Sequence, residues 1–142
     1  EVCALVMLDL DYFKGINDTY GHDAGDRYLQ SFSSVMSAMP EEHFLAARRS
    51  GDEFSMMIFG CADRGEIDGL LHDFYEQLAQ NQILLSDTES RAISASAGYA
   101  WTDNADAEIA ELLRHADEAL YEVKRDTKGT YREYCQSPSN VL

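Results

Sequence analysis

The sequence predicts an α+β fold in which helices pack as a second layer on a central, mostly antiparallel sheet. Three features lead to this: an apolar run opens the chain, a turn signal joins two further strand-like runs, and segments with helical periodicity separate the strand candidates. Because a hairpin alternates with helices, the sheet cannot be wholly parallel. A chain of 142 residues is expected to form one domain.

The first half of the chain begins with the apolar run 3–8, which is typical of a strand buried on both faces. A polar segment, 12–25, follows it, and apolar residues at three- and four-residue spacing then predict a helix over 26–39, with Pro40 just beyond its end. Residues 43–49 and 53–59 form the next two strand candidates. The turn signal between them predicts a hairpin with its tip near Gly51.

In the second half, residues 63–80 place their apolar side chains on one helical face. Apolar residues at every second position, separated by serine, glycine and alanine, predict a strand over 93–101. One optional short strand is expected before it. A second apolar stripe predicts a helix over 106–125, and residues 131–135 are expected to form an edge strand. The tail 136–142 has little apolar content, and we expect it to fray.

Charge and cysteine content limit the possible partners. The net charge of −15 argues against nucleic acid and against an anionic membrane surface, because both require a basic surface. No apolar stretch approaches the roughly 20 residues of a membrane span. We expect this domain to be cytoplasmic, with membrane anchoring of the full-length protein left open. Cys3, Cys61 and Cys135 form no C-x-x-C pair, so we expect mostly buried, reduced thiols and neither a zinc site nor a redox motif.

Acidic residues gather at two places that the fold should bring together. Asp9 and Asp11 follow the first strand, and Asp52 and Glu53 lie at the hairpin tip. A single aspartate at a strand end is usually a turn former or a helix cap, but four acids at two converging places favour a shared cation. Ligands that are all oxygen suit Mg²⁺, which also takes phosphate oxygens from a substrate.

Three ordered motifs then identify a family resemblance. Residues 9–26, DLDYFKGINDTYGHDAGD, resemble the D-x-D-x-F-K-x-x-N-D-x-x-G-H-x-x-G-D signature of GGDEF domains, the diguanylate cyclases, at every fixed position. Residues 49–54, RSGDEF, resemble the motif that names the family, and 116–124, ADEALYEVK, resemble its A-D-x-A-L-Y-x-A-K segment. The similarity extends over about residues 4–130, nearly the whole chain.

The resemblance implies a palm-like fold of the nucleotide-cyclase and polymerase kind. It also implies a reaction in which two GTP condense to cyclic di-GMP and release two pyrophosphates. Each domain of a homodimer would hold one GTP, and the two would face each other head to head. Two Mg²⁺ or Mn²⁺ ions per active site would assist the phosphoryl transfer.

The same resemblance assigns the metal site and the catalytic residues. Asp9 and Asp52 are the implied metal carboxylates, and the backbone carbonyl of Leu10 completes the shell. Glu53 is implied to bind metal or to assist deprotonation of the attacking hydroxyl, the alternative being a solvated strand residue. Lys14 is also counted among the catalytic residues, because its side chain would add positive charge at the phosphates.

Other positions are implied to bind the nucleotide. Backbone N–H groups at a helix start would bind the phosphates of the nucleotide, and lysines near the end of the last helix would bind them as well. The glycine of the hairpin would allow the nucleotide to approach the backbone closely. Two polar side chains would recognise the N1–H and amino edge of guanine, which adenine lacks. Taken alone, these positions also suit turn, cap and helix-end roles. The implied residues are Tyr12, Phe13 and Lys14 for phosphate, Lys124 and Lys128 for phosphate, Gly51 for close approach, and Asn17 and Asp26 for guanine.

The chain departs from the family pattern in three places. Ser50 replaces the first glycine of the hairpin motif, which leaves room for reduced activity. Thr127 and Gly129 stand where glycine and asparagine are usual. Many relatives carry an R-x-x-D product-inhibition site upstream of the hairpin, and here Glu41 and Phe44 occupy its two positions, so we expect that site to be absent.

The domain is assigned to residues 1–135. GGDEF domains usually open with a D-x-L-T-G-L-x-N-R segment, and Glu1 lies just past where it would end. We therefore expect an N-terminal sensor or regulatory domain in the full protein. Two functions stay open from the sequence: an active diguanylate cyclase, and a degenerate module that binds GTP and regulates a partner without turnover. A cyclase that uses ATP is disfavoured by Asp26.

Overall fold

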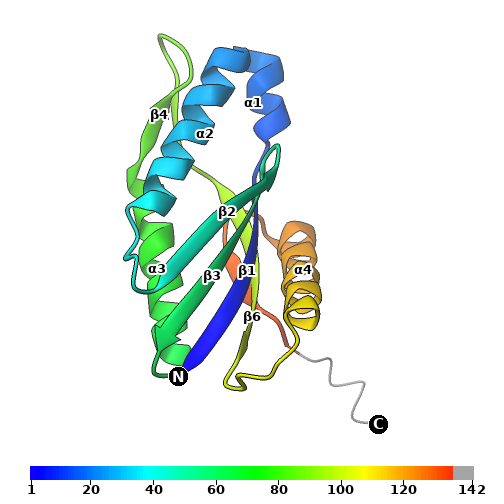
Figure 1. Ribbon diagram of the computed structural model, residues 1–142. Coiled ribbons are helices and arrows are strands. Elements are labelled where there is room, and N and C mark those ends of the chain that lie inside the picture. The colour runs from blue at the N-terminus through cyan, green and yellow to red at the C-terminus, as the bar shows by residue number, and fades with distance from the viewer. Residues whose placement is uncertain (136–142) are drawn as a thin grey trace.

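A computed structural model describes residues 1–135 of the chain, and its centre is a five-stranded sheet in the order β2-β3-β1-β6-β7 (Figure 1). The pairs β1–β3, β1–β6 and β2–β3 are antiparallel, and only β6–β7 is parallel. The expected mostly antiparallel sheet is therefore confirmed. The strands are β1 (Val2–Leu10), β2 (Phe44–Ser50), β3 (Glu53–Cys61), β6 (Ala95–Thr102) and β7 (Tyr131–Glu133).

Helices cover both faces of this sheet. In Figure 1, α4 (Ile109–Asp126) lies on one side of the sheet, and α2 (His22–Ser37) and α3 (Arg64–Gln80) lie on the other. The expected layer of helices is thus present, and α4 adds a further layer on the opposite face. The fourth helix, α1 (Phe13–Tyr20), forms within the polar segment that follows β1.

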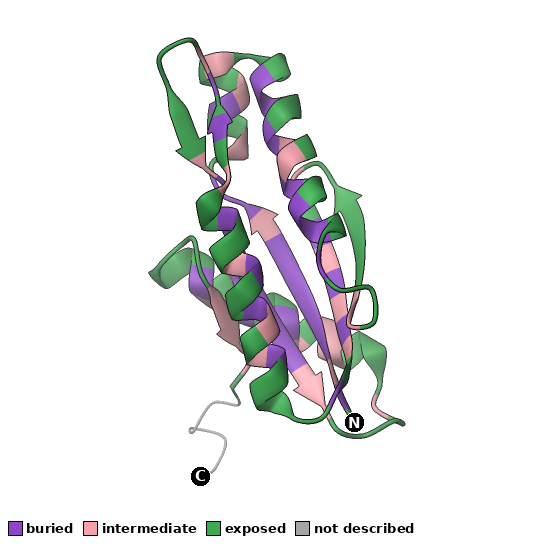
Figure 2. Cartoon of the chain, turned by 90° about the vertical axis from the view of Figure 1, so that its left-hand side faces the viewer, coloured by how far each residue is buried: buried purple, intermediate pink, exposed green. Residues whose placement is uncertain are grey.

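The apolar run of β1 is explained by these two helical layers. Val6 and Leu8 belong to the large core cluster that also contains Phe32 of α2 and Phe74 of α3. Met7, on the other face, packs with residues of α4 in a second cluster. Alternate residues of one strand are therefore buried against different helices. Figure 2 shows the same pattern, with central strands largely buried and helices buried on one side only.

A short hairpin projects beside α1 and α2, and the sequence indicates only one optional strand there. It consists of β4 (Gln82–Leu84) and β5 (Ser90–Ala92), which pair only with each other. The Arg27 guanidinium donates a hydrogen bond to the Leu84 carbonyl at 3.2 Å, and the Tyr20 hydroxyl donates to the Glu89 carboxylate. Each of these strands has only three residues, which is too short for the alternation of apolar and polar residues that predicts a strand. Their contacts come from residues distant in sequence, so the second strand was not predictable.

Two further expectations are answered in part. The three cysteines are free, but only Cys61 is buried, while Cys3 is half-buried and Cys135 is exposed because it follows the edge strand. Within residues 1–135, no helix has the length and apolar character needed to cross a bilayer. The expected frayed tail, 136–142, lies outside the described residues.

Candidate active site

Three of the four predicted acids converge at one end of the sheet. Asp9 lies opposite Glu53 in the β1–β3 ladder, and the Leu10 N–H donates to the Asp52 carbonyl at 3.0 Å. The end of β1 and the tip of the β2–β3 hairpin are therefore fixed against each other by backbone hydrogen bonds. The geometry brings together the residues that the sequence selected as metal ligands.

Helix α4 adds a lysine to this acidic group. Ala116 and Leu120 pack against Met7 of β1, and Lys124 lies one helical turn further along the same face. The Lys124 ammonium lies 2.5 Å from the Asp9 carboxylate. This hydrogen bond raises the pKa of Lys124 above its usual value, partial burial opposes the shift, and the charges of Asp9, Asp52 and Glu53 reinforce it.

The hairpin tip is a two-residue turn whose backbone explains the serine departure. Gly51, at the first central position, has φ of +47°, where glycine is favoured. Tyr12 is the only non-glycine residue with positive φ in the described chain, so Ser50 lies in an ordinary conformation. The Arg48 guanidinium donates to the Gly51 carbonyl at 2.9 Å and closes the turn. Serine at position 50 therefore imposes no backbone strain on the tip.

Asp11 does not join the other acids, contrary to the expected convergence of four carboxylates. It is 5% exposed, and its carboxylate accepts hydrogen bonds from Ser94 Oγ at 2.6 Å and Ser96 Oγ at 2.7 Å. Two hydroxyl donors make its burial tolerable. Ser96 Oγ also accepts from the Gly129 N–H at 3.1 Å, so Asp11 anchors the segment that contains Lys128. Its role is structural.

The start of α1 presents backbone donors next to the acids. Tyr12 precedes the helix in the left-handed conformation, with φ of +57°, and among the described residues no side chain caps this helix start. The first N–H groups of a helix have no intrahelical acceptor, so those of Phe13 and Lys14 can bind an anion. The Lys128 ammonium lies 4.6 Å from the centre of the exposed Tyr12 ring, which brings a second cation to this helix start.

Asn17 and Asp26 lie on adjoining helices. Asn17 is half-buried, and its side chain packs so closely on α2 that a Cβ at Gly25 would lie 1.8 Å from Asn17 Oδ1. Asp26 follows Gly25 and is exposed. The alternative role of Asn17 was a turn or cap residue, but Asn17 lies inside α1. The alternative role of Asp26 was an acid at a helix start, but the acid in the first turn of α2 is Asp23.

Two other departures from the family pattern have local explanations. Gly129 has φ of +85°, a conformation that glycine and asparagine adopt most readily, so glycine preserves the backbone where the family has asparagine. Glu41 is exposed, whereas Phe44 is half-buried and packs on the core. Neither side chain offers a cation to an anionic ligand.

Comparison with known proteins identifies the family. Residues 1–130 match the profile of the family described as diguanylate cyclase, GGDEF domain. The chain is 34% identical to diguanylate cyclase TpbB of Pseudomonas aeruginosa over 133 residues, covering 93% of this chain and 30% of TpbB. It is 31% identical over 137 residues to the probable diguanylate cyclase DgcE of Escherichia coli, covering 92% of this chain and 12% of DgcE.

Solved structures agree with the sequence comparison. A structure of TpbB comprising only its GGDEF domain superposes with a TM-score of 0.87 at 31% identity, covering 100% of this chain and 82% of that one. The GGDEF domain of DgcB from Caulobacter crescentus, in complex with c-di-GMP, gives 0.82 at 29% identity, covering 94% and 78%. The chain spans about a third or less of the length of the curated relatives named above. It belongs to the GGDEF family of diguanylate cyclases.

Proposed function

We propose that residues 1–135 form an active diguanylate cyclase domain that condenses two GTP into cyclic di-GMP and releases two pyrophosphates. The observation that supports this most strongly is the convergence of Asp9, Asp52 and Glu53 around the Lys124 ammonium at the end of β1. Such a concentration of unlike charges beside a free helix start suits phosphoryl transfer, which depends on positioning and charge neutralisation.

The donor set at this place fits a hard divalent cation. Asp9, Asp52 and Glu53 supply carboxylates, the Leu10 carbonyl supplies a further oxygen, and one lysine leaves the group with excess negative charge. These are ligands for Mg²⁺ or Mn²⁺, and we propose two ions per active site. When bound, such ions activate the 3′-hydroxyl and stabilise the departing pyrophosphate.

The protein's own groups would hold the triphosphate. The N–H groups of Tyr12, Phe13 and Lys14 lie at the start of α1, where the helix dipole favours an anion. Lys124 and Lys128 approach this place from the end of α4, and Lys14 adds a third cation. Close approach of the nucleotide would be allowed at Gly51.

Guanine selection is assigned to Asn17 and Asp26. The packing of Asn17 on Gly25 brings its amide next to the residue that precedes Asp26. A carboxylate accepts from the N1–H and amino groups of guanine, and adenine offers no such donor pair. A site built for these hydrogen bonds rejects the wrong base strongly, because its polar groups are then left unpaired.

One domain holds half of the reacting atoms, so we propose that catalysis requires a homodimer with two sites facing each other. We also propose that the full protein carries an N-terminal sensor or regulatory domain. The cyclase domain would be cytoplasmic and would contact neither nucleic acid nor membrane. The alternative is a degenerate module that binds GTP without turnover. The ordinary backbone of Ser50 and the preserved conformation of Gly129 favour the active enzyme.

Asp52→Ala tests the proposal directly. The protein is incubated with GTP and Mg²⁺, and cyclic di-GMP and pyrophosphate are quantified. The variant is expected to lose turnover while its urea unfolding midpoint holds or rises, because the change removes repulsion among the acids and leaves the Asp52 carbonyl in place. Asp103→Ala removes an exposed acid at the opposite end of β6 and serves as the control. Turnover at the parental rate in Asp52→Ala would refute the assignment, and GTP binding without product in the parent protein would establish the degenerate module.

A further inference from the structure

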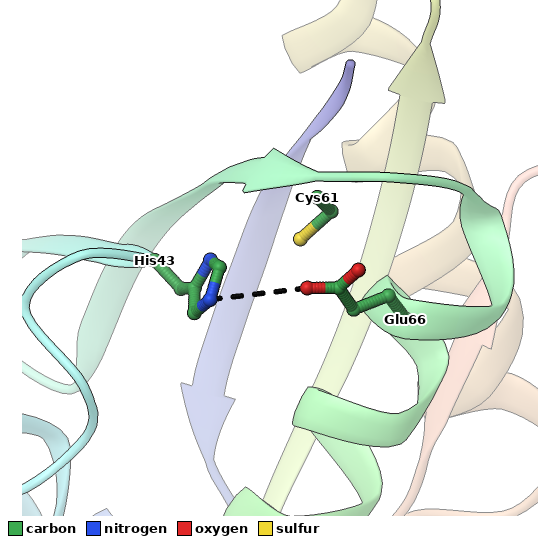
Figure 3. Close-up of side chains that lie close together, drawn as sticks. All are labelled: His43, Cys61 and Glu66. Atoms are coloured by element: carbon green, nitrogen blue, oxygen red, sulfur yellow. Dashed lines mark ion pairs between the residues drawn. The ribbon is translucent and has the colours of Figure 1, made fainter.

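A second group of ligand-bearing side chains lies at the other end of β3. His43 precedes β2, Cys61 ends β3, and Glu66 lies in the first turn of α3 (Figure 3). One ligand atom of each lies within 4.8 Å of the other two, and His43 Nε2 is 3.8 Å from Glu66 Oε1. Three different elements therefore direct a nitrogen, a sulfur and an oxygen toward one point.

Backbone contacts orient the histidine ring. His43 Nδ1 lies 2.9 Å from the Phe59 carbonyl. Because a carbonyl oxygen only accepts hydrogen bonds, Nδ1 carries a proton, and Nε2 is the nitrogen that faces Glu66 and can bind a metal through its lone pair. This is the arrangement in which histidines bind metals: one nitrogen is held by a backbone carbonyl and the other is a ligand.

A bulge in β3 lies beside this ring and turns the cysteine inward. Val2 pairs with Cys61 and Ala4 pairs with Ile58, so β3 has one more residue than β1 over this stretch. Gly60 lies in the bulge with φ of +68°, and a Cβ there would lie 3.6 Å from His43 Nδ1 and 3.3 Å from a neighbouring carbonyl. Cys61 is fully buried as a result.

The glutamate is held by its own helix start. Asp63 accepts a hydrogen bond from the Glu66 N–H at 2.9 Å, and Glu66 Oε2 accepts from the Ala62 N–H at 3.0 Å. This pair is a variant of the capping box, because the glutamate accepts from Ala62, the residue before the N-cap Asp63, and not from the N-cap itself. It occupies one carboxylate oxygen and leaves Oε1 directed at His43, as Figure 3 shows.

We propose that His43, Cys61 and Glu66 bind a transition-metal cation of the Zn²⁺ class through Nε2, Sγ and Oε1, with water as the fourth ligand. Zinc takes thiolate, imidazole and carboxylate together, and bond lengths of about 2.0–2.3 Å place tetrahedral ligands about 3.4–3.6 Å apart. The observed separations, none above 4.8 Å, require a contraction of at most about 1.4 Å, which side-chain rotation can supply. Because zinc binds the thiolate form of cysteine, binding would release the proton of the Cys61 thiol.

This site is distinct from the proposed Mg²⁺ site. β3 is nine residues long, so Glu53 and Cys61 lie about 26 Å apart along it. Its ligands include nitrogen and sulfur, whereas the acids near Lys124 offer only oxygen. A bound cation would join the starts of β2 and α3 to the end of β3. Sequence spacing argued against zinc because no cysteine pair exists, but these ligands come from three separate elements.

The test uses Co²⁺ as a spectroscopic probe on the purified protein in excess Mg²⁺, which saturates oxygen-only sites. Binding is followed by the thiolate-to-cobalt charge-transfer absorption and by competition with Zn²⁺. The variants are Cys61→Ser, His43→Gln, and Glu66→Gln, whose amide oxygen can still accept from the Ala62 N–H. His72→Gln is the matched control, because His72 also contacts a glutamate, Glu76 at 3.0 Å, but on an exposed helix face. Far-UV circular dichroism establishes that each variant is folded.

We expect one equivalent of Co²⁺ with a charge-transfer band that Cys61→Ser abolishes and His72→Gln leaves unchanged. His43→Gln should weaken binding by at least about tenfold, since even loss of an indirect partner costs 10–100-fold. Zn²⁺ should raise the unfolding temperature of the parent and of His72→Gln equally, and that of His43→Gln by less at the same metal concentration. A parent protein without the band, or a band that survives Cys61→Ser, would overturn the proposal and leave His43 and Glu66 as an ion pair beside a capped helix.

Discussion

Replacement of Gly98 by alanine should separate α4 from the sheet. Gly98 lies in β6, and a Cβ there would lie 2.1 Å from the Leu120 nitrogen, 2.4 Å from the Ala116 oxygen and 2.6 Å from the Ala119 carbonyl carbon. All three atoms belong to the backbone of α4, so no side chain can rotate away to make room. The helix itself has to move.

The size of the effect follows from these distances. Non-bonded carbon atoms pack at about 3.5–4.0 Å, so α4 would have to withdraw by about 1 Å or more at this point. Overpacking of a core usually costs about 1–3 kcal/mol, and occasionally more. Because Ala116, Ala119 and Val123 are fully buried beneath this helix, we expect a loss near the upper end, about 3 kcal/mol.

Urea unfolding monitored by circular dichroism measures this change, with Gly69→Ala as the control. Gly69 lies inside α3, and in the described chain no heavy atom lies within 4 Å of its added Cβ beyond the helix itself. Alanine should therefore stabilise that helix by about 0.5–1 kcal/mol. A Gly98→Ala variant whose unfolding free energy stays within about 0.5 kcal/mol of the parent would show that α4 does not rest on β6 as described.

Three further predictions concern the site and the pH dependence of stability. Asp26→Ser should reduce the preference for GTP over ATP by about 1.5–3 kcal/mol, the value of a hydrogen bond to a charged group; an unchanged preference in competition assays would place base recognition elsewhere. Gly25→Ala should raise KM for GTP by displacing the Asn17 side chain, with an unchanged circular dichroism spectrum; an unaltered KM would contradict the role of Asn17. Hydrogen bonds from arginines, first Arg125, lower the pKa of Asp126 from 3.8 to about 2. Its stabilising effect is therefore fully present above pH 3.8 and is lost as the pH falls through about 2. The difference in urea midpoint between Asp126→Asn and the parent should be present at pH 5 and much smaller at pH 2.

Local patterns in the sequence were sufficient for the sheet and for the position of its acids. The apolar run of β1 and the turn signal at Gly51 each depend on neighbouring residues, and the two strands then meet by ordinary antiparallel pairing. The burial of Asp11 was not accessible in this way, because its partners Ser94 and Ser96 are 83 and 85 residues away. An aspartate at a strand end looks the same in sequence whether it faces solvent or two hydroxyls.

The grouping of His43 with Cys61 and Glu66 was also not predictable from local sequence patterns. It depends on a one-residue bulge in β3, and a strand pattern with period two does not show where an extra residue is inserted. Gly60 is the one local signal in the sequence, since an isolated glycine in a strand indicates a bulge or a close approach, and its φ of +68° in the structure agrees with a bulge.

The end of α4 connects both halves of the proposed active site, and this explains why packing far from the site should affect it. One face of the helix continues from Ala116 and Leu120 to Lys124, whose ammonium contacts Asp9. Just beyond the helix, Lys128 lies over the Tyr12 ring at the start of α1. A helix that withdraws from β6 would carry both lysines away, one from the acids and one from the expected phosphate position. Loss of activity in Gly98→Ala should therefore exceed what its fraction of unfolded protein explains.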